Sequence, residues 1–125
     1  MPVLTAPPVL GDLLKREYDR HYCREEIVLQ ERAGGYPLGA VLGRVTASGE
    51  YALSPASGST GAESACAVLI EATPPGKKTG LIVARGPVIV ADAALVFDAS
   101  VDSDDLVQGK HQQLTAFGIV VREAV

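Results

Sequence analysis

Glycine and proline divide the sequence from Glu26 onward into short apolar runs, and this punctuation limits the fold more than any other feature. The run ACAVLIEA (65–72) is almost entirely apolar, and LIVARGPVIV (81–90) consists of two β-branched runs separated at Gly86–Pro87. Runs of this length, rich in Val and Ile and bounded by turn residues, are typical of strands. We therefore predict a mainly β domain in which 65–72 is a central buried strand and the chain bends sharply at Gly86–Pro87.

Further strands are predicted at residues 26–31, 40–47, 49–53 and 94–99, and in the closing segment IVVREA. The second and third of these should form a hairpin across Ser48–Gly49. The stretch PLGAVLGRVTASGEY around it contains no His, Cys or Lys, and we interpret it as architecture. Residues 54–64 are small and polar and are expected to form a surface loop, and residues 73–80 a turn.

One helix is predicted near the end of the sequence. Asp102 or Ser103 would cap it, and Asp104 and Asp105 would lie in its first turn, where the helix dipole favours acidic side chains. Gly109 inside the helix costs about 1 kcal/mol relative to Ala, and Gly118 should end it. One face is expected to carry Leu106, Val107, Leu114 and Phe117, with Lys110 at its edge.

We expect residues 1–23 to form a flexible N-terminal arm and linker, and residues 24–125 to form the β domain. Residues 1–11 are apolar and rich in proline, which suits either a disordered terminus or a segment that becomes ordered on a partner. Residues 12–25 are dense in charge, and Asp12 is a possible cap for a short helix from Leu13 to Tyr18.

Composition argues against several classes of function. The net charge is −4, the sequence pI is near 5.1, and there is no Trp, so neither a basic DNA-binding face nor a set of stacking rings is expected. No run of 18 apolar residues and no signal-peptide pattern is present, and we expect a protein of a reducing, cytoplasm-like space without a membrane partner. Cys23 and Cys66 lie far apart and are predicted to be free thiols.

No residue set predicts catalysis, a metal site or a cofactor. PPGKKTG resembles a phosphate-binding loop, but Glu71 stands where the first Gly is needed and Lys78 follows Lys77 in place of Ser or Thr. A zinc site would need every His and Cys in the chain. The serines of 54–64 are not in a nucleophile-elbow context, and only His21 and His111 are available as bases. We therefore expect a protein that is not an enzyme.

Three stretches in fixed order resemble the head decoration proteins of lambda-like phages. They are REEIVLQERAGGYPLGAVLGRVTASGEYALSPASGSTGAESACAVLIEA (24–72), GLIVARGPVIVADAALVFD (80–98) and QQLTAFGIVVREA (112–124). The resemblance implies a compact β-clip-like fold and homotrimers on the outside of the expanded head at three-fold positions. There they would bind the major capsid protein and stabilise the shell against the pressure of packaged DNA. It also implies a structural protein of a phage or prophage virion, present in the host cytoplasm during assembly, with no cofactor and no direct contact with nucleic acid.

The resemblance further implies that the N-terminal arm becomes ordered on the capsid. The residues expected to make this contact are the larger apolar side chains of the arm and one threonine: Val3, Leu4, Thr5, Val9, Leu10, Leu13 and Leu14. Two alternatives remain open. One is another virion accessory protein of the tail or fibre. The other is a biotinyl- or lipoyl-like carrier domain, for which Lys77 or Lys78 would be the modified residue.

Overall fold

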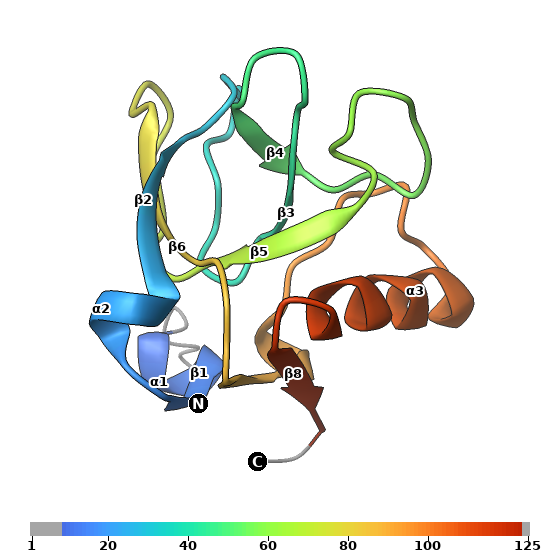
Figure 1. Ribbon diagram of the computed structural model, residues 1–125. Coiled ribbons are helices and arrows are strands. Elements are labelled where there is room, and N and C mark those ends of the chain that lie inside the picture. Colours follow the sequence, from blue (N-terminus) through green and yellow to red (C-terminus); the bar gives the residue numbers. More distant parts are fainter. Residues whose placement is uncertain (1–8, 124–125) are drawn as a thin grey trace, which may run out of the picture.

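The eight strands of the computed structural model, which describes residues 9–123, form two sheets (Figure 1). The five-stranded sheet has the order β2-β6-β5-β3-β4 and is antiparallel throughout, while the three-stranded sheet has the order β1-β7-β8 and ends in a parallel pair. The predicted mainly β fold is confirmed. The strands are β1 (Leu14–Glu17), β2 (Arg24–Val28), β3 (Val41–Arg44), β4 (Tyr51–Leu53), β5 (Ala65–Leu69), β6 (Thr79–Val83), β7 (Val88–Ala91) and β8 (Ile119–Arg122). The helices are α1 (Leu10–Leu13), α2 (Arg20–Cys23), the 3-10 turn η1 (Asp92–Ala94) and α3 (Asp104–Thr115).

Strand β5 has both faces buried, which explains its nearly continuous apolar sequence. Ala67 and Leu69 belong to a core on one side of the five-stranded sheet, together with Leu42 and Ile82. Val68 points to the other side, into a core that reaches the three-stranded sheet and α3. The predicted central strand and the predicted hairpin of β3 with β4 are both confirmed.

The chain passes from one sheet to the other at Gly86–Pro87, where β6 of the five-stranded sheet ends and β7 of the three-stranded sheet follows. Gly86 donates its N–H to the carbonyl of Phe117 at 2.8 Å. A Cβ at Gly86 would collide with the carbonyl of Gly118, which itself has a φ of 81°. Glycine at both positions therefore allows the end of α3 to cross the link between the sheets.

Helix α3 begins where the sequence predicts, because the Ser103 hydroxyl accepts a hydrogen bond from the N–H of Leu106 at 3.3 Å. The expected position of Lys110 at the edge of the apolar face is wrong. Lys110 is only 3 % exposed and lies with Leu114 on the buried side of the helix, while Phe117 is 47 % exposed. The Lys110 ammonium reaches the loop 54–63, and in this way it finds hydrogen-bond acceptors inside the protein.

Two predicted elements differ in the structure. Residues 94–99 do not form a strand: η1 occupies their start, and only Val96 bridges to the chain before β3, at Ala40. The chain then turns away, because the Asp98 carboxylate accepts the N–H of Ser100 at 3.1 Å. The predicted helix from Leu13 to Tyr18 is also wrong, since α1 ends at Leu13 and the following residues form β1. Pairing with β7 outweighs the weak local preference for helix.

Candidate functional site

The seven residues predicted to contact a partner through the N-terminal arm fall into three groups. Val3, Leu4 and Thr5 lie outside the described residues. Val9 is 63 % exposed, directly before α1. The other three pack on the body: Leu10 and Leu14 are half-buried against the main core, and Leu13 is completely buried within it.

The described part of the expected linker, residues 9–23, is thus folded against the domain. Leu13 and Cys23 are both fully buried, and β1 between them pairs with β7. The dense charge of residues 12–25 does not predict this folding. Burial of only two side chains, Leu13 and Cys23, is enough to hold so short a segment on the domain. Of the seven residues predicted to contact a partner, Leu10, Leu13 and Leu14 thus serve the core of the domain itself.

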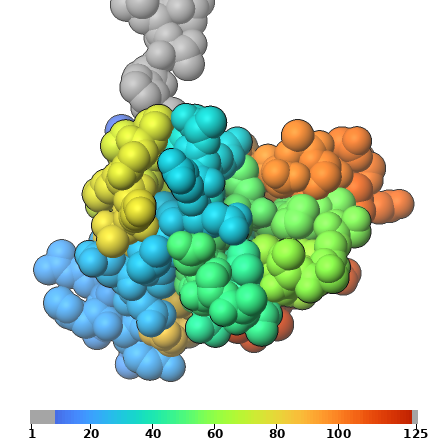
Figure 2. All heavy atoms as spheres, turned by 90° about the horizontal axis from the view of Figure 1, so that it is seen from above, coloured from blue at the N-terminus to red at the C-terminus, as the bar shows by residue number. Residues whose placement is uncertain are grey.

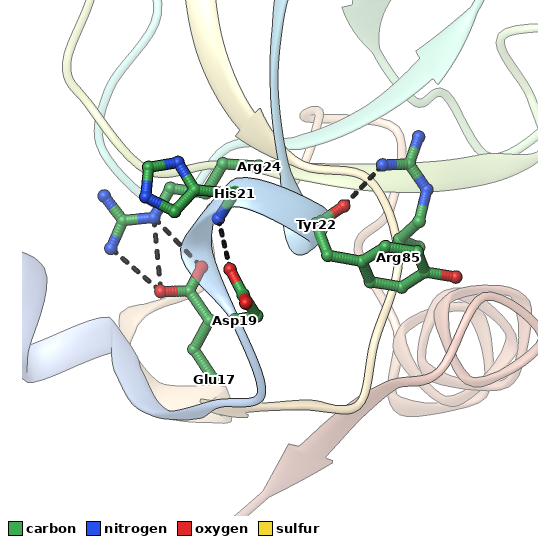
Figure 3. Close-up of polar contacts among 6 residues, drawn as sticks. All are labelled: Glu17, Asp19, His21, Tyr22, Arg24 and Arg85. Atoms are coloured by element: carbon green, nitrogen blue, oxygen red, sulfur yellow. Dashed lines mark hydrogen bonds and ion pairs between the residues drawn. The ribbon is translucent and has the colours of Figure 1, made fainter.

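Two exposed tyrosines mark the corner where β1, α2 and β2 meet, and Figure 3 shows one of them, Tyr22, beside Arg85. Tyr18 and Tyr22 are 71 % and 55 % exposed, and their rings stack edge to face with centroids 6.3 Å apart. Arg85 lies over the Tyr22 ring at 5.6 Å, donates to the Tyr22 carbonyl at 2.6 Å and pairs with Glu25 at 2.9 Å. Tyrosine and arginine held in this way are the residue types that contribute most binding energy at protein interfaces.

A second ion pair fixes the same corner from the other side. The Glu17 carboxylate accepts hydrogen bonds from Nε of Arg24 at 2.9 Å and from Nη2 at 3.0 Å, and its side chain is only 11 % exposed (Figure 3). Asp19 caps α2 by accepting the N–H of His21 at 2.7 Å. This bidentate pair and the cap hold β1 and β2 at a fixed angle, so the tyrosines are presented on a rigid support.

A hollow of about 740 Å³ lies beside β2. One wall is formed by residues 25–28 and the other by Arg44 and residues 48–51. In the view from above (Figure 2), the light-blue β2 region lies next to the green turn that leads into β4. The hollow is lined by three carboxylates, Glu25, Glu26 and Glu50, and by the guanidinium of Arg44, and Glu25 also pairs with Arg85 next to it. Carboxylates remain in excess, so the hollow is acidic. We refer to it as the β2 hollow.

The described residues offer little for catalysis. Both cysteines are free thiols, as predicted, and burial raises the pKa of Cys66 against a smaller opposing effect of Arg44, which makes the thiol a weak nucleophile. Within residues 9–123, no three His, Cys, Asp or Glu side chains are grouped as a metal site would require. Across the same residues, none of the helices has the length and apolar character needed to span a bilayer.

Sequence reasoning missed both the tyrosine corner and the β2 hollow. Tyr18 and Tyr22 are four residues apart in a stretch expected to be a linker, and a linker gives no reason to expect that their rings meet. Glu25 and Glu26 follow each other on a strand, and their order in the sequence gives no sign of the hollow. What matters is that β2 forms an edge of its sheet, and a sheet order is not visible in one sequence.

Comparison with protein families gives one clear result. The family model described as "Bacteriophage lambda head decoration protein D" matches residues 3–119. The match covers both sheets up to the start of β8, all of α3, and most of the segment before α1. A search of curated proteins finds no match.

Proposed function

The chain belongs to the family of bacteriophage lambda head decoration protein D, and we propose that it binds as a homotrimer to the outside of an expanded phage head. The sites would be the three-fold positions, where the trimer stabilises the shell of major capsid protein against the pressure of packaged DNA. The observation that carries this proposal is the family match over residues 3–119. A carrier domain modified at Lys77 or Lys78 does not agree with this family.

The N-terminal segment is proposed to make the contact with the major capsid protein. Val3, Leu4, Thr5 and Val9 would supply the apolar surface, while Leu10, Leu13 and Leu14 attach the segment to the domain. Support comes from the exposure of Val9 and the burial of Leu13 only four residues later. A trimer presents three such segments, so weak single contacts add up to strong binding through a high effective concentration.

Co-sedimentation with capsids tests this function. The purified chain is mixed with expanded and with unexpanded capsids of the phage that encodes it, and light scattering gives the mass of the free protein. We expect a trimer that sediments with expanded capsids and much less with unexpanded ones. Equal binding to both forms, or no binding to either, would contradict the proposed role, and a monomer at tens of micromolar would contradict the trimer.

A further inference from the structure

Strand β2 has a free edge that faces the β2 hollow. Within the described residues β2 pairs with β6 alone, and the hollow begins where a single parallel bridge joins Leu29 to Tyr51. The Leu29 N–H points toward β6 and donates to the carbonyl of Lys78 at 2.7 Å. The Gln30 N–H points the other way and donates to the carbonyl of Tyr51 at 2.8 Å. Since successive N–H groups of a strand point to opposite sides, those of Val28 and Glu26 point into the hollow.

Such an edge is a template for another strand. Val28 is 47 % exposed, and both Glu25 and Glu26 are exposed at the same edge. The hollow separates this edge from the turn before β4, so a neighbouring backbone has room to approach. Its acidic lining favours a strand that carries positive charge.

The same chain has a second free edge with the opposite charge. Strand β1 lies at the end of the three-stranded sheet, and its middle residues Lys15 and Arg16 are both exposed. The Tyr18 N–H donates to Pro87 at 3.0 Å, on the side of β7, so the Glu17 N–H points to the free side. Within residues 9–123 no other strand of this chain pairs with that side.

We propose that the basic edge of β1 in one copy pairs with the acidic edge of β2 in the next copy, at the β2 hollow. This inference rests on the proposed trimer and adds which two surfaces of the chain meet in it. It joins two different patches of the same chain, which is the kind of interface that closes into a ring. Only α2 separates β1 from β2 in the sequence, and the end of β1 and the start of β2 lie close together beside α2 (Figure 1).

The tyrosine corner supports a second copy as the occupant. Tyr18 follows β1 directly and Tyr22 precedes β2 by two residues, so both exposed rings lie between the two edges. Arg85 links Tyr22 to Glu25 of the hollow through its two short contacts. Aromatic and arginine side chains thus border both halves of the contact, where an interface needs its apolar centre.

A charge swap gives the sharpest test. We compare Lys15→Glu/Arg16→Glu, Glu26→Lys/Glu50→Lys, and the chain carrying all four changes, by light scattering. Each double variant should lose the trimer and approach the monomer mass of 13.0 kDa, because like charges then face each other. The fourfold variant should regain the trimer. If both double variants stay trimeric, or if the fourfold variant stays monomeric while folded, the proposed pairing is wrong.

A proline substitution tests the backbone part of the contact. Val28→Pro removes an N–H that points into the hollow and leaves the bonds to β6 in place, which an edge strand tolerates. We expect a folded monomer by circular dichroism, while Val28→Thr, which keeps the N–H, remains a trimer. A trimeric Val28→Pro protein would overturn strand pairing. If this variant fails to fold, the charge swap decides.

Two controls separate this inference from the proposed function. Lys78→Glu and Glu31→Lys reverse exposed charges outside both edges, and both should remain trimeric. The unmodified chain is tested in parallel for its mass and for capsid binding. If the unmodified chain is trimeric and binds capsids while the edge variants are also trimeric, only the edge pairing is refuted. If the unmodified chain is a monomer, the proposed trimer itself is refuted.

Discussion

At the scale of single residues, Lys110 is the clearest case of a side chain whose role depends on its environment. Its ammonium donates to the Ser54 hydroxyl at 2.9 Å and to the carbonyls of Pro55 and Glu63, each at 2.6 Å. Burial lowers the pKa of Lys110, and the carboxylates of Glu63 and Asp98 act against this effect. The residue therefore joins α3 to the loop 54–63.

Replacing Lys110 with Met should destabilise the fold by about 1–3 kcal/mol, because the two carbonyls and the Ser54 hydroxyl lose their donor inside the protein. Urea unfolding measures the change. The control is Gln112→Met on the exposed side of the same helix, which should remain within about 0.5 kcal/mol of the unmodified chain. Equal stability of the two variants would show that Lys110 is dispensable.

His111 makes stability depend on pH. Its Nε2 atom is buried and has no hydrogen-bond partner in the described structure. Burial lowers the pKa of His111 below 6.5, with Asp92 opposing the shift. The unfolded chain therefore takes up the proton first as pH falls, so the stability contribution is complete above the unfolded pKa and declines below it.

We expect the melting temperature to fall between about pH 7.5 and pH 5.5, and to fall less in His111→Gln, because a glutamine at this position does not titrate. Thermal unfolding at both pH values measures the two slopes. The hydrogen bond from the Ser100 hydroxyl is the main reason that the pKa of Asp98 is lowered from 3.8. Titration of this carboxylate therefore changes stability only at pH values below the range from about 5.5 to 7.5. Identical slopes would remove His111 as the cause.

At the scale of elements, two glycines should respond in opposite ways to the same substitution. Gly43 is buried in β3, and a Cβ there would collide with the Ala62 carbonyl, so Gly43→Ala should destabilise by about 1–3 kcal/mol. Gly109 lies within α3 with open space around its Cβ position, so Gly109→Ala should stabilise by about 0.5–1 kcal/mol. Urea unfolding gives both values, and a change of the same sign in the two variants would contradict this account.

Elements with dense apolar patterns could be predicted from the sequence, and those that depend on distant partners could not. Strands β5, β6 and β7 and the Ser103 cap of α3 appear where expected, because burial on both faces or a local cap leaves a signal in the sequence itself. Strand β1 was missed, since its residues LKRE show no strand pattern and only β7 makes them a strand. For the candidate site, the N-terminal contact segment stays a prediction, and the tyrosine corner could be found only from the fold.

At the scale of the whole molecule, the segment before Leu10 and the body can be separated by two variants. Deleting residues 1–8 should leave the melting temperature nearly unchanged and weaken co-sedimentation with expanded capsids. Leu13→Ala removes a fully buried side chain and should cost about 2–5 kcal/mol of stability. Full capsid binding by the deletion variant would refute the proposed role of the segment, and an unchanged stability of Leu13→Ala would refute its anchoring role.

The order β1-β7-β8 has a consequence for the time at which the protein can fold. Its three strands come from residues 14–17, 88–91 and 119–122, so the smaller sheet is assembled only after the ribosome has released residue 122. Pairing over such sequence separations makes folding slow, on the order of milliseconds to seconds. Until β8 is available, β1 and β7 can form only an antiparallel pair, so the smaller sheet stays incomplete while the rest of the chain is still being synthesised.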